Sequence, residues 1–207
     1  MQKVALITGT GSGIGKALAK LLLSEKYLVF GYSRTNQIKH ANFTFTKIDL
    51  SDLEEVQRIK FPKLKATTEV LLVNNAATIG SILPIDKKSE KEIIGEYNLN
   101  IISPTLLSRK FINAYADNIK LLINIGSGAA NSPISSWSTY CATKSALDML
   151  IQVIAEEKHK NLQVFSIHPG VVDTNMQKEI RKSDSEFFPL HQKFMDYYAN
   201  QKLFSVE

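Results

Sequence analysis

Two side chains suited to proton transfer, Tyr140 and Lys144, stand four positions apart in the sequence. Residues at this spacing share one face of a helix, so the phenol and the ammonium are expected to lie close together. An ammonium about 4 Å from a phenolate stabilises it by roughly 4 kcal/mol at an effective dielectric of ~20, which equals about three pKa units. Burial opposes this effect, and we expect a smaller net lowering of the pKa of Tyr140 that suits it to proton transfer. Taken singly, Tyr140 is also typical of a core aromatic residue and Lys144 of a solvated helix position.

A glycine-rich turn, TGTGSGIG, occupies residues 8–15 between a short apolar run and a helical pattern. Glycine allows the tight turn, lets the backbone approach a pyrophosphate, and lets the following helix pack closely against a sheet. The helix N-terminus then presents unpaired N–H groups to the phosphates. Such a turn alone is a weak signal, because a flexible loop has the same composition, but its place between a strand and a helix favours dinucleotide binding. The residues expected to contact this cofactor are Gly9, Ser12, Gly13, Ile14 and Gly15.

The choice between NADH and NADPH is expected to depend on the residues after the second strand, Ser33, Arg34 and Thr35. An acidic residue there would bind the ribose 2′-hydroxyl of NADH, but no carboxylate lies between Leu28 and Ala41. The guanidinium of Arg34 can pair with a 2′-phosphate, and the hydroxyls of Ser33 and Thr35 can donate to it. The sequence therefore predicts NADPH as cofactor, although Arg34 is also consistent with an exposed turn residue.

Short apolar runs alternate with amphipathic stretches along the chain, which predicts parallel βαβ units. We expect an α/β fold with a Rossmann-type, doubly wound parallel sheet in the order 3-2-1-4-5-6, flanked by helices, in a single domain over residues 1–207. Ligands of such sheets bind beyond the carboxyl ends of the strands. Strands are expected at Val4–Ile7, Tyr27–Tyr32, Phe43–Ile48, Glu69–Val73, Leu121–Ile125 and Leu162–Ile167. Helices are expected after the glycine turn, after a cap at Ser51, over Glu90–Ala116 with a bend near Pro104, and over Tyr140–Lys158.

The composition is typical of a globular protein, with 207 residues, 44% hydrophobic side chains and a formal charge of +5. The lysines are scattered, without the aromatic-interleaved basic block of a nucleic-acid groove, so a solvated surface is favoured over an RNA-binding module. Cys141 is the single cysteine, which excludes an internal disulfide and favours a reducing compartment. No stretch has the length of a signal-peptide core or a membrane span, and no His or Cys spacing suggests a metal site. We expect a cytoplasmic protein with no metal, nucleic-acid or membrane partner.

Several motifs together give the sequence a resemblance to the short-chain dehydrogenase/reductase family along nearly its whole length. The glycine turn matches the family's Thr-Gly-x-x-x-Gly-x-Gly form, and residues 74–77 resemble its Asn-Asn-Ala-Gly stretch, with Ala77 in place of the last glycine. Most specific is Ser127, followed by Tyr140 thirteen positions later and by Lys144 four positions further on. The resemblance implies further cofactor contacts from residues that follow the strands, namely Asp49, Leu50, Asn75, Ala76, Pro169, Val172 and Thr174, and from Tyr140 and Lys144.

The same resemblance implies a carbonyl reductase acting on a small-molecule substrate. Tyr140 would protonate the carbonyl oxygen, Ser127 would donate a second hydrogen bond to it, and Lys144 would also hold the ribose hydroxyls. The fourth catalytic residue of the family is an asparagine on the long helix that organises a water relay to the lysine. Asn100 is preferred for this role because a small residue, Ser103, follows it by three positions, and Asn98 is the alternative.

Within the family, residues 121–181 are similar to sepiapterin reductases and bacterial benzil reductases, which implies a ketone, diketone or pterin-like substrate. The similarity rests on Trp137–Ala142, Asp148–Leu150 and Asp173–Gln177. Residues 173–204 are rich in aromatic side chains and are expected to form a lid over an apolar substrate, with simple packing against the core as the alternative. The family's C-terminal helix and seventh strand are expected to be missing, and the resemblance leaves a homodimer or a homotetramer open. The alternative function is a non-catalytic NADPH-binding regulator, which the presence of Ser127, Tyr140 and Lys144 disfavours.

Overall fold

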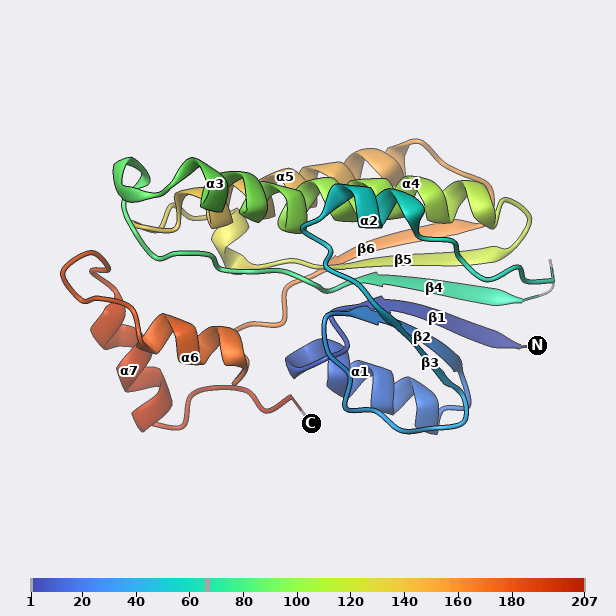
Figure 1. The fold of residues 1–207 in the computed structure, drawn as a ribbon, viewed down its shortest axis with the longest axis horizontal. Helices are drawn as coiled ribbons and strands as arrows, with labels where there is room; N and C mark the ends of the chain where they lie inside the picture. The colour runs from blue at the N-terminus through green and yellow to red at the C-terminus, as the bar shows by residue number, and fades with distance from the viewer. Residues whose placement is uncertain (1, 66–67, 207) are drawn as a thin grey trace.

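Within the described residues, six parallel strands form one sheet in the order β3-β2-β1-β4-β5-β6, which confirms the predicted fold class and strand order (Figure 1). The computed structural model describes residues 2–65 and 68–206, so positions 1, 66, 67 and 207 of the expected domain lie outside it. The strands are β1 (Lys3–Thr8), β2 (Leu28–Ser33), β3 (Phe43–Lys47), β4 (Glu69–Asn74), β5 (Ile119–Ile125) and β6 (Leu162–Ile167).

Helices cover both faces of the sheet, with α2, α3, α4 and α5 on one face and α1 on the other, while α6 and α7 lie beyond the carboxyl ends of the strands (Figure 1). Because both faces are covered, the central strands read as continuous apolar runs. Along β1, Val4 and Leu6 enter the core under α4 and α5, and Ala5 and Ile7 enter the core under α1. The helices are α1 (Gly13–Ser24), α2 (Leu53–Arg58), α3 (Glu90–Tyr97), α4 (Ser103–Ala114), α5 (Ser138–Glu156), α6 (Asn175–Arg181) and α7 (His191–Ala199).

The cap of α2 differs from the prediction. Asp52 is the N-cap, and its carboxylate accepts hydrogen bonds from the backbone N–H groups of Glu54 and Glu55. The predicted cap, Ser51, instead donates both its backbone N–H and its hydroxyl to the carboxylate of Asp49. The local turn that Asp49 forms therefore moves the start of the helix one residue further along the chain.

The long helix expected over Glu90–Ala116 is interrupted by a π-helical turn, Asn98–Ile102, between α3 and α4. Pro104 stands in the first turn of α4, where its missing N–H costs little, so the irregular turn precedes the proline. π-Turns are rare and occur frequently at functional sites. This one contains Asn98 and Asn100, the two asparagines that the sequence left as alternatives.

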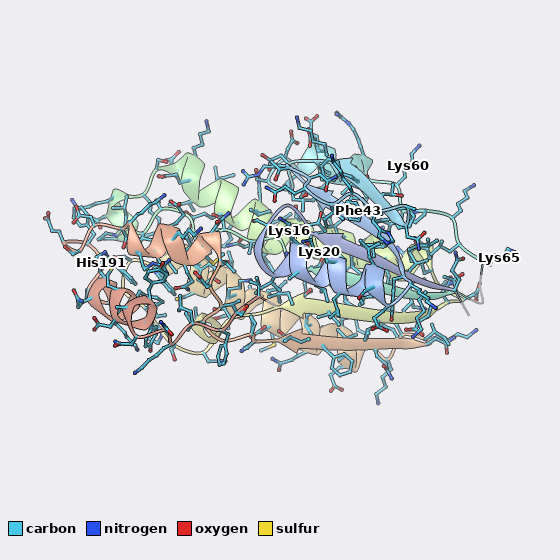
Figure 2. All side chains as sticks on the ribbon, turned by 90° about the horizontal axis from the view of Figure 1, so that it is seen from below. Lys16, Lys20, Phe43, Lys60, Lys65 and His191 are labelled. Atoms are coloured by element: carbon cyan, nitrogen blue, oxygen red, sulfur yellow. The ribbon has the colours of Figure 1, made fainter. Side chains whose placement is uncertain are left out.

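The labelled lysines do not form one continuous patch on the surface (Figure 2). Figure 2 shows Lys60 and Lys65 at the end of the molecule opposite His191, and Lys16 and Lys20 on α1 between them. Within residues 2–65 and 68–206, no helix combines the length and the hydropathy needed to cross a bilayer.

Candidate active site

The carboxyl ends of the strands open into a cavity of about 1020 Å³ that extends from the glycine turn to α6 and α7. This volume reaches the upper end of the usual range for small-molecule sites, about 300–1,000 Å³, so the cavity has room for an extended ligand. Most of the predicted site residues line it: Gly9, Ser12, Gly13, Ile14, Ser33, Arg34, Asp49, Leu50, Asn75, Ala76, Ser127, Tyr140, Lys144, Pro169, Val172 and Thr174. Gly15 and Asn100 do not line it.

Gly15 has a packing role in the structure. A Cβ atom at this position would lie 2.3 Å from Asn75 Nδ2 and 2.5 Å from the carbonyl oxygen of Gly9, both far inside normal contact distance. Gly9 itself has a φ of +75°, in the left-handed region that favours glycine. The two glycines thus allow α1 to begin directly against the turn, so that its N-terminus faces the cavity as a dinucleotide pyrophosphate requires.

Thr8 links the glycine turn to the end of β4. Its hydroxyl donates to the carbonyl of Val73 at 3.3 Å and accepts from the backbone N–H groups of Asn75 at 2.9 Å and Ala76 at 3.0 Å. The side-chain amide of Asn75 returns a hydrogen bond to the carbonyl of Thr8 at 2.8 Å. These contacts fix two walls of the cavity relative to each other.

The end of β2 presents an exposed cation to the cavity. Arg34 is exposed there, whereas the buried hydroxyl of Ser33 donates to the carbonyl of Thr35 at 2.7 Å and holds the turn in shape. The pKa of Asp49 is held below its ordinary value chiefly by the backbone N–H of Ser51, then by the Ser51 hydroxyl, and also by the charge of Arg34. The carboxylate of Asp49 is therefore occupied by Ser51, and the cationic side chain remains available to an anionic ligand.

Tyr140 and Lys144 lie on the first turns of α5, facing the ends of β5 and β6, and both are buried. The phenol donates to the sulfur of Met176 at 3.7 Å, and the Lys144 Nζ atom donates to the carbonyl of Ile125 at 2.8 Å. Burial raises the pKa of Tyr140, and the influence of the Ser127 side chain, which lowers the pKa, only partly offsets this. The predicted net lowering of the pKa of Tyr140 is therefore wrong. Lys144 Nζ lies 5.7 Å from the centre of the Tyr140 ring, and desolvation of the phenolate dominates.

Burial acts on Lys144 in the opposite sense, because it disfavours the charged ammonium. It lowers the pKa of Lys144 to about 8, and the negative charge of Asp148 opposes that shift. Tyr140 therefore keeps its proton at neutral pH, and Lys144 loses its charge as the pH rises through about 8.

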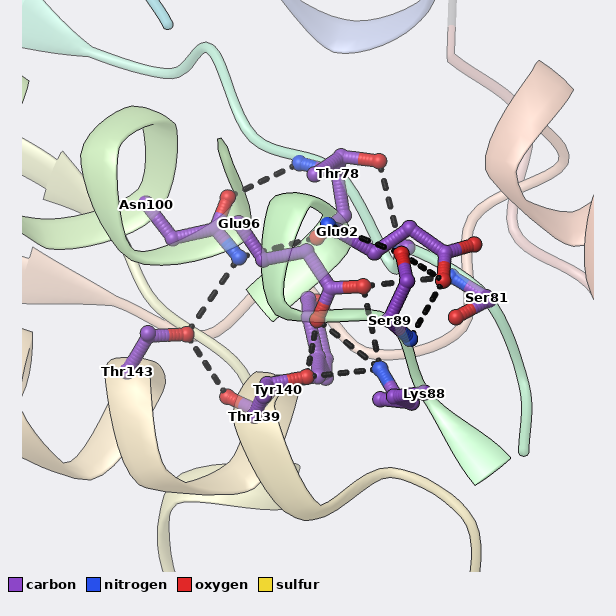
Figure 3. Close-up of polar contacts among 11 residues, drawn as sticks. Thr78, Ser81, Lys88, Ser89, Glu92, Glu96, Asn100, Thr139, Tyr140 and Thr143 are labelled. Carbon is purple, nitrogen blue, oxygen red and sulfur yellow. Dashed lines mark hydrogen bonds and ion pairs between the residues drawn. The ribbon is translucent and has the colours of Figure 1, made fainter. Parts of the chain in front are cut away.

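The structure separates the two candidate asparagines. Asn100 accepts from the backbone N–H of Thr78 at 2.9 Å and donates to the carbonyl of Thr78 at 2.9 Å and to the hydroxyl of Thr143 at 3.3 Å (Figure 3). Asn98 instead donates to the carbonyl of Ser51, on the side of α2. Asn100 therefore lies beside α5, where it joins the segment after β4 to the helix that carries Tyr140 and Lys144.

A second polar connection between the same three segments was not found from the sequence. The Lys88 ammonium donates to both carboxylate oxygens of Glu96, at 3.0 and 2.9 Å, and to the hydroxyl of Thr139 at 2.8 Å (Figure 3). Thr139 also donates to Glu96, and Glu96 accepts from the backbone N–H of Ser81 at 3.2 Å. One signal was available, because Glu96 and Asn100 on one helix, and Thr139 and Thr143 on the other, share a spacing of four residues.

Aromatic residues close the end of the cavity farthest from the glycine turn. Trp137 stacks on Phe188 with ring centres 5.4 Å apart, lies 5.5 Å from Phe194, and meets the ring of Tyr140 edge-on at 5.6 Å. Trp137, Phe194 and Tyr197 line the cavity, while Phe188 is fully buried behind them. Residues of the segment 173–204 thus both wall the cavity and pack into a core cluster that they share with Trp137 and Tyr140.

Comparison with known proteins identifies the class of this fold and site. The family model of the short chain dehydrogenases matches residues 3–185, and the chain belongs to that family of oxidoreductases. It is 31% identical over 223 aligned positions to a benzil reductase ((S)-benzoin forming) of Bacillus cereus, covering 99% of this chain and 90% of the relative. It is 30% identical over 208 positions to the sepiapterin reductase of Mus musculus, covering 88% and 79%. These relatives confirm the resemblance inferred from the sequence.

A solved structure of similar fold is that of 4-hydroxyisoleucine dehydrogenase complexed with NADH. It matches with a TM-score of 0.77 and 26% sequence identity, and the match covers 89% of this chain and 79% of that one.

Proposed function

We propose that this enzyme uses NADPH to reduce a carbonyl group of an apolar, aromatic ketone or 1,2-diketone to an alcohol. The observation that carries the proposal is the position of Ser127, Tyr140 and Lys144, between the cleft beside the glycine turn and the aromatic end of the same cavity. A dinucleotide with its pyrophosphate at α1 would extend toward Tyr140, and a substrate would enter from the side of Trp137 and Phe194. The names of the benzil and sepiapterin reductases support a carbonyl substrate.

When bound, the reduced nicotinamide supplies a hydride to the carbonyl carbon. The residues of the chain protonate and hydrogen-bond the carbonyl oxygen. Tyr140 keeps its proton at neutral pH because burial raises its pKa, so the phenol can act as the general acid. Ser127, which lines the same cavity as that phenol, donates to the oxygen as negative charge develops on it. The Lys144 ammonium, buried beside the Tyr140 ring, stabilises the phenolate that remains.

The charge state of Lys144 gives a prediction for the pH dependence. Because the ammonium titrates with a pKa of about 8 and stabilises the phenolate only while it is charged, kcat/KM for reduction should fall as the pH rises through that value. Initial rates with NADPH and a non-ionisable ketone, measured across neutral and alkaline pH, test this. A profile that stays flat through that region would show that Lys144 does not act as a cation in the reaction.

The choice of NADPH rests on the Arg34 guanidinium at the cavity and on the absence of an acidic residue between Leu28 and Ala41 that would favour a ribose 2′-hydroxyl. Replacing Arg34 with Asp should raise the KM for NADPH by roughly 10–100-fold, since a charge-assisted hydrogen bond contributes about 1.5–3 kcal/mol, and should leave the KM for NADH little changed. Steady-state kinetics with both cofactors measure this.

Lys39→Asp is the matched control, because Lys39 is exposed on the same loop but does not line the cavity. Equal increases in the NADPH KM for the Lys39 and Arg34 variants would mean that net charge, and not a specific contact, governs affinity.

The proposal is tested directly by following NADPH oxidation with a panel of diketones, quinones, aldehydes and pterins. Turnover of aromatic ketones or diketones is the expected result. Tight NADPH binding without oxidation by any member of the panel would instead favour the non-catalytic regulator.

A further inference from the structure

One helical turn beyond Lys144, α5 carries a carboxylate that the proposed reaction does not use. Asp148 Oδ1 accepts a hydrogen bond from the Ser166 hydroxyl at 2.5 Å, and Oδ2 accepts one from His168 Nε2 at 2.7 Å. Ser166 and His168 are two positions apart at the end of β6, so both side chains point to the face of the sheet that α5 covers. The side chain of Asp148 is mostly buried, with 13% of its surface exposed.

The fit of this group depends on Gly126, which immediately precedes Ser127. A Cβ atom at Gly126 would lie 2.4 Å from His168 Cδ2 and 2.9 Å from Ser166 Oγ, so any side chain there would displace both partners of Asp148. Because Gly126 has no side chain, the His168 ring has room to hydrogen-bond the carboxylate of Asp148. The two partners of Asp148 at the end of β6 are thus packed against the residue that precedes Ser127.

We infer that Asp148, held in place by Ser166 and His168, is a positioning residue that acts through Lys144 as its fixed counter-charge. This inference rests on the proposed function, because the proposed reaction requires Lys144 to be charged at the working pH. Spacing of four residues on a helix places the two side chains on one face, where a carboxylate favours the ammonium form of the lysine.

The other groups around Lys144 make Asp148 its principal counter-charge. On α5, the titratable groups that face the ammonium are Tyr140 and Asp148. From β5 it meets the carbonyl of Ile125, which is a neutral acceptor. From the end of β6, His168 acts on Lys144 through Asp148, whose carboxylate it hydrogen-bonds. Burial lowers the pKa of Lys144 to about 8 even with Asp148 present, so without the carboxylate the ammonium should lose its proton at a lower pH.

The experiment is an NMR titration of protein labelled with 13C-lysine, without cofactor, in which the Lys144 signal is assigned by its loss in Lys144→Met. In Asp148→Asn, which keeps the shape but removes the charge, the Lys144 midpoint should move to lower pH by about one unit or more. The alkaline limb of the kcat/KM profile should move with it. Glu156→Gln, which removes a carboxylate from the far end of the same helix, should move neither.

A Lys144 midpoint in Asp148→Asn that matches the parent protein would overturn the inference. If Asp148→Asn does not fold, the double variant Ser166→Ala/His168→Gln provides the test, because it keeps the charge of Asp148 but removes the two side chains that hold the carboxylate. The Lys144 midpoint should then fall by a smaller amount. An unchanged midpoint in the double variant would contradict the inference that Ser166 and His168 fix the position of Asp148. The titration needs no turnover. Failure of the parent protein to reduce any carbonyl compound would sink the proposed function while leaving the Lys144 shift to be seen.

Discussion

Replacing Tyr140 with Phe should lower kcat/KM for carbonyl reduction by about 10²–10⁴-fold, the usual contribution of a positioned general acid. The substitution removes the phenolic proton and leaves the ring that packs edge-on against Trp137. The hydroxyl donates to the sulfur of Met176 at 3.7 Å, a weak interaction, so the fold should tolerate its loss. NADPH affinity should change far less than turnover, which fluorescence titration of the bound cofactor can measure.

The matched control is Tyr115→Phe. Tyr115 is also buried, but its hydroxyl donates to the carbonyl of Pro62, close to where β5 begins and away from the cavity. This variant should keep the parent kcat/KM. If Tyr140→Phe retained the parent rate, or if both variants lost activity equally, the phenol of Tyr140 would have no role as proton donor.

The second large effect concerns stability. Replacing Lys88 with Met should lower the free energy of unfolding by about 3–5 kcal/mol, because it leaves the carboxylate of Glu96 buried without its cation. The side chains of Lys88 and Glu96 have 0% and 4% of their surface exposed, so water cannot replace the lost partner. A Cβ atom at Gly80 would lie 1.8 Å from Glu96 Oε1, which shows how tightly the backbone encloses this oxygen. Urea denaturation followed by circular dichroism measures the effect.

Two controls separate the buried charge from a loss of packing. Lys88→Met/Glu96→Met should recover much of the lost stability, because a buried ion pair exchanged for apolar side chains of similar volume is often close to neutral. Arg58→Met breaks an exposed pair with Glu54 and should cost less than about 1 kcal/mol. A loss below about 1 kcal/mol in Lys88→Met itself would contradict the reading of this contact as a buried, paired charge.

The sequence predicts the sheet well because its signals are local and repeated. Each strand is a short apolar run that ends at a turn residue, and right-handed crossovers leave few strand orders to choose from. The glycine turn and the spacing of Tyr140 and Lys144 are equally local, so the sequence alone places the elements that carry them. Asp52 shows where such signals fail. Asp49, Ser51 and Asp52 all have side-chain oxygens that can accept a hydrogen bond from the backbone at a helix start. Because Ser51 is held by Asp49 in a local turn, Asp52 becomes the cap.

Features that depend on contacts between distant segments could not be read from the sequence. Glu96 meets Lys88 and Thr139 only because the π-turn and the segment after β4 bring three parts of the chain together. The pKa of Tyr140 differs from the prediction for a related reason. The spacing places a cation near the phenol but does not report how deeply the phenol is buried, and burial is the larger effect.

The most direct test of the proposed reaction is transfer of deuterium from the cofactor. The enzyme would be incubated with benzil and with NADPH dideuterated at C4 of the nicotinamide, and the product analysed by mass spectrometry and NMR. We expect benzoin that carries one deuterium per molecule at the carbinol carbon. Benzoin without deuterium, or oxidation of the cofactor with benzil recovered unchanged, would contradict hydride transfer to a carbonyl carbon at this site.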